Sequence, residues 1–255
     1  MTLHTTDSVC AITGSQPANL RRWYRSGLIT RSDIQQGWND VQLGEIQSMM
    51  QLTASGATQN EISQAHLEAR AVNTAGWIGR KGDLIWQLEY GSDRALYREL
   101  RTLADSFSGD DFINSLMRPL SRWLHDDKRC GADRRLARFH QCVMKRASLN
   151  MRHSARNKAT PLLLEALSVA DETEIWLEAI RLGGQGFSVD ISSDVLNTSS
   201  QARIGYEHHM LWCGAGISEA SHQHYHDDKV AGKPVMLCGP DRSITKQAKR
   251  RLRSA

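Results

Sequence analysis

The chain has 255 residues, with 32 Lys and Arg against 28 Asp and Glu and a formal net charge of +4. No run of 18 apolar residues occurs, and the start MTLHTTDSV lacks a basic and then apolar signal pattern, which argues against membrane spans and secreted proteins. A chain of this length can bury one large core or two modest ones, and we expect a cytoplasmic protein. Its five cysteines are widely spaced and never form C-x-x-C, so we expect reduced, mostly buried thiols.

The first two predicted helices have the pattern of a helix-turn-helix. Residues 6–12 predict a short helix with Val9 and Ile12 inward, and Thr13-Gly14 predicts a turn. Pro17 suits the first turn of the next helix, and Gly27 suits a left-handed stop. Leu20 and Trp23 are expected to face inward. The outer face then carries positive charge suited to a nucleic-acid groove, from Arg21, Arg22 and Arg25, with Arg31 just beyond.

A second pair of helices is predicted between residues 39 and about 68. Asn39 or Asp40 can cap the first of them, Gly56 can stop it, and Thr58 with Glu61 forms a capping-box pattern for the second. The apolar residues of the first helix keep a helical spacing: Val41, Leu43, Ile46, Met49, Met50 and Leu52.

Residues 1–70 resemble the winged helix-turn-helix domain of MerR-type regulators. The family pattern falls without gaps on Pro17, Asn19, Leu20, Arg21, Trp23, Tyr24, Arg25, Gly27, Leu28 and Ile29. The resemblance implies a domain that binds double-stranded DNA. The expected DNA-contacting residues are Pro17, Asn19, Arg21, Arg22, Tyr24, Arg25 and Arg31.

The expected wing departs from the MerR pattern. Family members place a glycine-rich hairpin with an arginine after the recognition helix, whereas here Arg31 is followed only by SDIQQGW, with Gln36 at the arginine position. Residues 1–70 hold five basic and six acidic side chains, so few phosphates would be neutralised. Two interpretations stay open: operator recognition, or a domain that has partly lost it.

The middle of the chain predicts a linker and a helical bundle. Three glycines, Gly76, Gly79 and Gly82, indicate a flexible linker over residues 71–91. Within it, residues 83–90 predict a short helix. Residues 92–158 predict a bundle, in which Ser92 caps a helix with core residues 96, 100 and 103. Helices are expected at 112–125, where Pro119 should kink or restart the helix, and at 132–152.

Residues 159–255 predict a small Rossmann-like parallel sheet with a basic tail. Strands are expected at PLLLEALSV, FSVDIS, HMLWCGA and KPVMLCG, with helices at ADETEIWLEAIRLGGQG and SEASHQHYHDDKVAG. The fold class is therefore mainly α with α/β. The order of the three parts, and the segments MRPLSRWL, IWLEAIRL and MLWCG, resemble the MlrA- and BluR-like subgroup of MerR regulators, whose C-terminal half is a degenerate cobalamin-binding-like domain.

No cofactor is expected in the C-terminal part. Cobalamin binding needs an axial histidine between the first strand and helix, and residues 170–174 hold neither histidine nor glycine. No G-x-G-x-x-G follows a strand, so a nucleotide site lacks support. His222 and His226 have metal-ligand spacing on a helix, but a solvated polar helix is the preferred interpretation. Four tryptophans are expected in cores or interfaces: Trp86, Trp123, Trp176 and Trp212.

Charge is unevenly distributed. Residues 118–158 carry twelve Lys and Arg against three acids, whereas residues 159–240 carry four against eleven. The basic block is either a surface for acidic partners or DNA, or a solvated face paired with the acidic domain. Its proposed partner-binding residues are Arg134, Arg135 and Arg138.

Together these features predict a non-enzymatic transcription regulator that binds DNA as a homodimer. The subgroup resemblance implies biofilm genes as targets and a protein signal from a partner with a GGDEF or EAL domain. The alternative is an interaction protein that no longer binds DNA and sequesters a regulatory partner. No nucleophile, base and orienting group can be assembled into an enzyme site.

Overall fold

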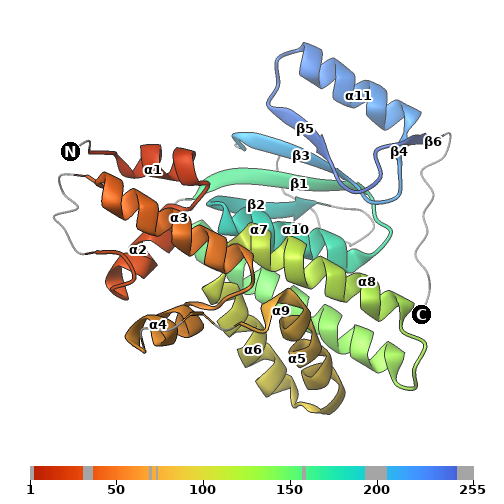
Figure 1. Cartoon of the computed structure of the whole chain (residues 1–255). Helices are drawn as coiled ribbons and strands as arrows, with labels where there is room; N and C mark the ends of the chain where they lie inside the picture. The colour runs from red at the N-terminus through yellow and green to blue at the C-terminus, as the bar shows by residue number, and fades with distance from the viewer. Residues whose placement is uncertain are drawn as a thin grey trace. The chain divides into compact units, whose positions relative to one another are not determined.

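The computed structural model describes residues 3–30, 37–68, 71–72, 74–156, 159–192 and 206–245 (Figure 1). The chain forms two compact units, residues 1–120 and 121–255, and each is described by itself. In the described part, no helix is long and apolar enough to cross a membrane.

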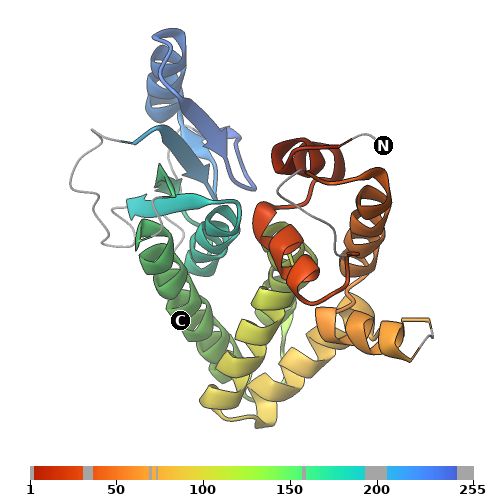
Figure 2. The same ribbon diagram turned by 90° about the vertical axis from the view of Figure 1, so that its left-hand side faces the viewer.

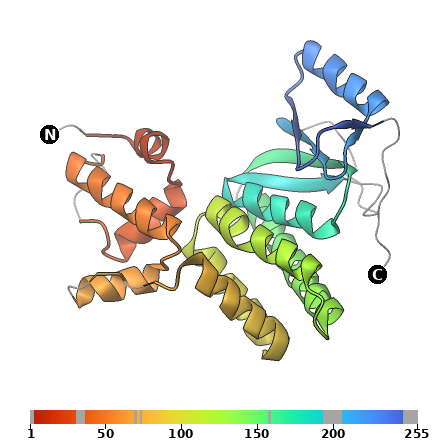
Figure 3. The ribbon, with the colours of Figure 1, turned by 45° about the vertical axis from the view of Figure 1, so that its right-hand side comes forward.

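The first unit begins with four helices that share one small core (Figure 3). They are α1 (Thr6–Thr13), α2 (Pro17–Arg25), α3 (Asp40–Ala54) and α4 (Gln59–Leu67). The core is built from Val9, Leu20, Trp23, Ile29, Trp38, Ile46, Met49, Ala57 and Ile62. The predicted inward position of Ile12 is wrong, since this residue is 54% exposed. Val41 of α3 is also exposed, at 57%.

Local sequence signals set the ends of these helices. The Thr5 side chain caps α1, and α3 and α4 each begin with a complete capping box, Asn39 with Gln42 and Thr58 with Glu61. Gly14 and Gly27 follow α1 and α2 with φ of +72° and +75°, which only glycine adopts without strain. The predicted caps and stops are confirmed.

The predicted flexible linker at Gly76, Gly79 and Gly82 is wrong. These glycines lie within helix α5 (Gly76–Tyr90). Tertiary contacts override their low helix propensity: the Trp77 ring packs 4.6 Å from Phe107, and its Nε1 donates to the Ala54 carbonyl at 2.8 Å. A Cβ on Gly56 would lie 2.9 Å from the Gly76 carbonyl carbon, so glycine is needed where α5 meets the end of α3.

The rest of the first unit consists of α6 (Asp93–Ser106), the short α7 (Gly109–Asp111) and the π-helical segment η2 (Phe112–Met117). Ser92 caps α6, and residues 96, 100 and 103 are buried, as predicted. Helix α8 (Arg118–Asp126) follows η2 directly, so a helix restarts near Pro119, as expected. The predicted 92–158 bundle is divided between the two units, because their boundary falls after Leu120.

The second unit contains a four-stranded parallel sheet of order β2-β1-β3-β5 (Figure 1). Its strands are β1 (Thr160–Ser168), β2 (Phe187–Ser192), β3 (His208–Cys213) and β5 (Val235–Cys238), and all four were predicted. A second, two-stranded sheet of β4 (Ile217–Ser218) and β6 (Ile244–Thr245) was not, because two-residue strands carry no periodic signal.

Helices cover the two faces of the sheet unequally. The core on one face joins Leu162, Leu164 and Trp212 to Ile175 and Ala179 of α10 (Glu172–Gly184). The long helix α9 (Ala132–Arg156) packs beside α10 and β2, and α11 (Glu219–Val230) contacts β5 and the small sheet (Figure 2). The described structure is thus mainly helical with a small parallel sheet.

We expect Gln42→Ala to weaken the first unit by about 1–3 kcal/mol, because a buried polar group loses its partner. Gln42 is 0% exposed, and its Nε2 donates to the Thr30 carbonyl at 2.8 Å. Native-state hydrogen exchange across α3 measures the change. The control Gln47→Ala removes an exposed side chain from the same helix and should stay within about 0.5 kcal/mol. Equal effects would contradict the assigned role of Gln42.

Candidate nucleic-acid interface

The orientation of α2 is fixed by its apolar face. Pro17 occupies the first turn, and Leu20 and Trp23 are 0% and 1% exposed. Because side chains three and four residues apart share one face of a helix, Arg21 and Arg25 project together from another side. Both side chains are exposed, as the sequence predicts.

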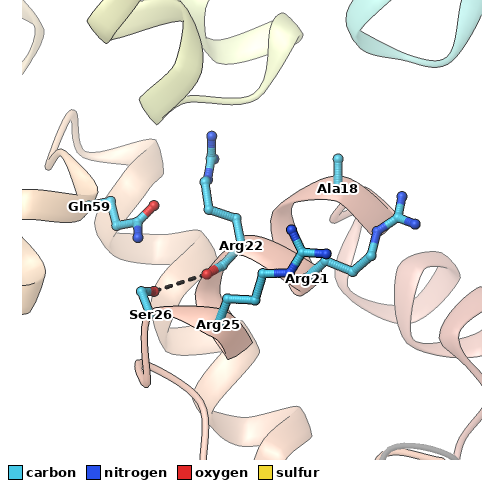
Figure 4. Close-up of a pocket in the computed structure, with 6 residues that line it drawn as sticks. All are labelled: Ala18, Arg21, Arg22, Arg25, Ser26 and Gln59. Carbon is cyan, nitrogen blue, oxygen red and sulfur yellow. Dashed lines mark hydrogen bonds between the residues drawn. The ribbon is translucent and has the colours of Figure 1, made fainter. Parts of the chain in front are cut away.

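These two arginines line an open groove of about 610 Å³ (Figure 4). Its lining residues come from α2, the position after α2, and the start of α4: Ala18, Arg21, Arg22, Arg25, Ser26 and Gln59. Two exposed guanidinium groups and an amide offer hydrogen-bond donors of the kinds that contact phosphates and base edges. Gln59 was missed by the sequence analysis, since nothing local marks it as facing α2.

Arg22 does not lie on the outer face, contrary to the prediction. Its side chain leads away from Arg21 and Arg25 (Figure 4). Its Nη2 donates to Asn19 Oδ1 at 2.9 Å and to the Ser106 carbonyl at the end of α6 at 3.3 Å. Burial lowers the pKa of the Arg22 guanidinium from its ordinary value, and nearby Asp105 opposes this shift. Arg22 therefore anchors α2 to the end of α6.

Asn19 and Tyr24 also differ from the prediction. Asn19 is 8% exposed and accepts the Arg22 hydrogen bond. The Tyr24 ring is half-buried and meets Trp38 edge to face, with ring centroids 6.0 Å apart. Both residues thus make side-chain contacts within the domain, which a one-dimensional motif does not encode.

Arg31 and Gln36, and with them the expected wing, lie outside the described residues. The chain on either side is anchored to the domain. Thr30 contacts α3 through its backbone N–H, which donates to Glu45 Oε2 at 2.8 Å. Trp38 pairs with His4 through two backbone hydrogen bonds of 2.8 Å. The sequence analysis missed the anchor Glu45, which looks like an ordinary surface acid on α3.

In the second unit, Arg135 is not part of an exposed basic surface, so this prediction is wrong. Arg135 Nη2 lies 2.8 Å from Asp127 Oδ2, and the two side chains are 3% and 2% exposed. Hydrogen bonds from Arg129 and Arg135 hold the pKa of Asp127 well below its usual range. A buried cation is stabilised by such a pair, which explains why Arg135 points inward. Arg134 is exposed and Arg138 is half-buried.

The turn between β1 and α10 is occupied by the protein's own polar contacts. Asp171 caps α10, and His125 Nε2 of α8 lies 3.5 Å from Asp171 Oδ2. His140 Nδ1 of α9 lies 3.0 Å from Thr173 Oγ1. The sequence analysis considered only residues 170–174 and missed these two histidines, which the fold brings in from other helices.

The histidine-rich helix α11 has no buried residue. His224 lies 3.6 Å from Asp228, and His209 of β3 lies 2.8 Å from Glu165 of β1. In the described ranges, no group of three or more His, Cys, Asp or Glu side chains is arranged to hold a metal ion.

The predicted tryptophan and cysteine environments are partly right. Trp212 is 3% exposed and lies in the sheet core, whereas Trp86 is 57% exposed, so a core position for Trp86 is wrong.

All five cysteines are free thiols, of which Cys142 and Cys213 are buried and Cys130 is exposed. Burial raises the pKa of Cys213 to about 11 and that of Cys238 to about 12, so both stay protonated at neutral pH.

Residues 159–235 match the family model described as "Transcriptional regulator MlrA, C-terminal domain". The chain is also similar to the HTH-type transcriptional regulator MlrA of Escherichia coli strain K12, at 20% identity over 94% of this chain and 100% of the relative. MlrA of Salmonella typhimurium strain SL1344 is 18% identical with the same coverage. The predicted resemblance to MlrA-like regulators is confirmed, at low identity.

We expect Arg22→Ala to destabilise the first unit by about 1–3 kcal/mol, because the Asn19 side chain and the Ser106 carbonyl lose a charged donor. Arg25→Ala, which removes an exposed arginine from the same helix, should change stability by less than about 0.5 kcal/mol. Hydrogen exchange across α2 and the end of α6 in the intact protein measures both. Equal protection in the two variants would refute the anchoring role of Arg22.

Proposed function

We propose that this protein is a DNA-binding transcription regulator whose helix α2 reads the DNA major groove. The observation that carries the proposal is the pair Arg21 and Arg25, which are exposed along one groove, while Arg22 beside them donates a hydrogen bond to the Ser106 carbonyl and anchors the helix. The similarity to regulators named HTH-type along almost the whole chain supports it.

The charges of the first unit favour a dimer. Residues 1–70 carry five basic and six acidic side chains, so a single copy neutralises few phosphates and should bind a half-site weakly. A two-fold dimer would present two α2 helices to half-sites about one helical turn apart, and each bound module would raise the effective concentration of the other. We therefore propose a cytoplasmic homodimer with MerR-type operator recognition.

The second unit is proposed to receive a signal from another protein rather than from cobalamin. The subgroup resemblance favours a partner with a GGDEF or EAL domain, and biofilm genes as targets. The Asp171 and Thr173 side chains are already engaged by α10 and by histidines of α8 and α9, so the β1–α10 turn serves internal packing.

A second candidate function is an interaction protein that sequesters a regulatory partner without binding DNA. The slight negative charge of residues 1–70 and the shortened wing sequence favour this alternative. DNA binding by the intact protein distinguishes the two functions.

We expect Arg21→Ala and Arg25→Ala each to weaken binding to a duplex selected by the wild-type protein from a random library. A lost bidentate guanine contact should cost about 1–3 kcal/mol at one base pair, and a lost phosphate contact should weaken all duplexes alike. Fluorescence anisotropy at moderate salt measures the affinities.

The matched control is Arg94→Ala, which removes an exposed arginine from α6 and should leave affinity almost unchanged. If both α2 variants bind as tightly as wild type, the DNA-reading proposal fails and the interaction protein becomes the better account.

We expect no shift in the absorption bands of adenosylcobalamin when it is mixed with the protein, and no light-dependent change of oligomeric state. Residues 170–174 offer no axial histidine, and Asp171, Glu172 and Glu174 would repel the phosphate of the corrinoid tail. Spectra and light scattering of the mixture before and after illumination provide the measurement. Stoichiometric, tightly held corrinoid would overturn this expectation.

A further inference from the structure

Helix α9 carries a long row of mainly basic side chains, separate from the arginines of α2. The row occupies positions three or four residues apart, which places its members within about 80° of arc on a helix that turns 100° per residue. It consists of Arg134, Arg138, Gln141, Lys145, Leu149, Arg152 and Arg156. From first to last, the row extends roughly 33 Å at 1.5 Å per residue.

The charge of α9 is unusually one-sided. The helix holds seven Lys and Arg and one acid, Asp133, and that acid lies about 100° around the helix from Arg134. Arg134, Lys145, Arg152 and Arg156 are exposed, and Arg138 is half-exposed. A row of exposed basic side chains along one helix is typical of a helix that meets a polyanion.

Helix α6 shows what a solvated charged helix of this protein looks like. It carries three arginines and three acids, and Arg101 Nε lies 3.7 Å from Asp105 Oδ2, one turn away. Interspersed charges favour solubility without attracting one class of partner. Within the described residues, Arg134, Arg152 and Arg156 make no ion pair with an acidic side chain.

We propose that the α9 row is a second contact surface for duplex DNA, which binds the phosphate backbone without reading sequence. A packed protein helix would need an apolar seam, and the row offers only Leu149, with Met144 beside it. Phosphate contacts instead need cations and polar donors, which the arginines, Lys145 and Gln141 supply. Duplex DNA therefore fits this row better than the protein partner expected at Arg134 and Arg138.

This inference rests on the proposed function. In that function α2 reads the DNA, and the phosphate contacts of α9 would add to the few that the nearly neutral residues 1–70 can make. A row that neutralises phosphates raises affinity for every duplex and steepens the salt dependence of binding. It would thus compensate for the few cations among residues 1–70.

The test compares two triple variants of the full-length protein. Arg134→Gln, Arg152→Gln and Arg156→Gln together remove three charges of the row, while Arg138 and Lys145 stay because they interact elsewhere in the molecule. The matched control, Arg94→Gln with Arg98→Gln and Arg101→Gln, removes three exposed charges from α6. Circular dichroism confirms that both variants keep their helix content.

Affinity for the selected duplex and for a random-sequence duplex is measured from low to moderate salt. Loss of three phosphate contacts should reduce the slope of log affinity against log salt by roughly 2 to 3, on both duplexes, in the α9 variant alone. An α9 variant whose slope equals that of wild type, as expected if the row binds an acidic protein, overturns the inference. Equal slope changes in both variants also overturn it, because they reflect net charge only.

The outcomes separate this inference from the proposed function. If the wild-type protein selects a duplex and the α9 slope is unchanged, only the inference fails. If the wild-type protein binds no duplex at any salt concentration, both fail.

Discussion

The inward packing of Leu20 and Trp23 fixes the orientation of α2, and the proposed DNA interface depends on it. With these two side chains buried, Arg21 and Arg25 must point outward together. Arg22 strengthens the arrangement through its hydrogen bond to the Ser106 carbonyl. A core of nine buried residues thereby sets the orientation of the helix that we propose binds DNA.

The two units differ in how their charged side chains are distributed. The first carries outward arginines in a nearly neutral domain, which favours sequence reading over strong general attraction to DNA. The second places seven Lys and Arg on α9, of which Arg135 is taken up internally by Asp127. In the proposed account, sequence reading and phosphate attraction, which many DNA-binding domains combine on one surface, lie on separate helices.

The sequence predicted the elements whose signals are local. Pro17, Gly27 and the two capping boxes set helix ends correctly, and the apolar runs of β1 and β3 indicated buried strands. Predictions failed where distant contacts decide. Trp77 packs on Phe107 and makes a helix of the glycine-rich segment, Asp127 draws Arg135 inward, and Ser106 draws Arg22 away from the outer face. The two members of each pair are separated in sequence, so periodicity and motif spacing do not predict that they are in contact.

Genomic footprinting of the intact protein tests the central claim, that α2 reads DNA in a dimer, most directly. The account predicts protected sites in promoter regions that share a two-fold symmetric sequence, with half-sites one helical turn apart and sites lost when Arg21 and Arg25 are replaced together. Protection without a shared sequence, or a pattern that the double replacement leaves unchanged, would contradict it.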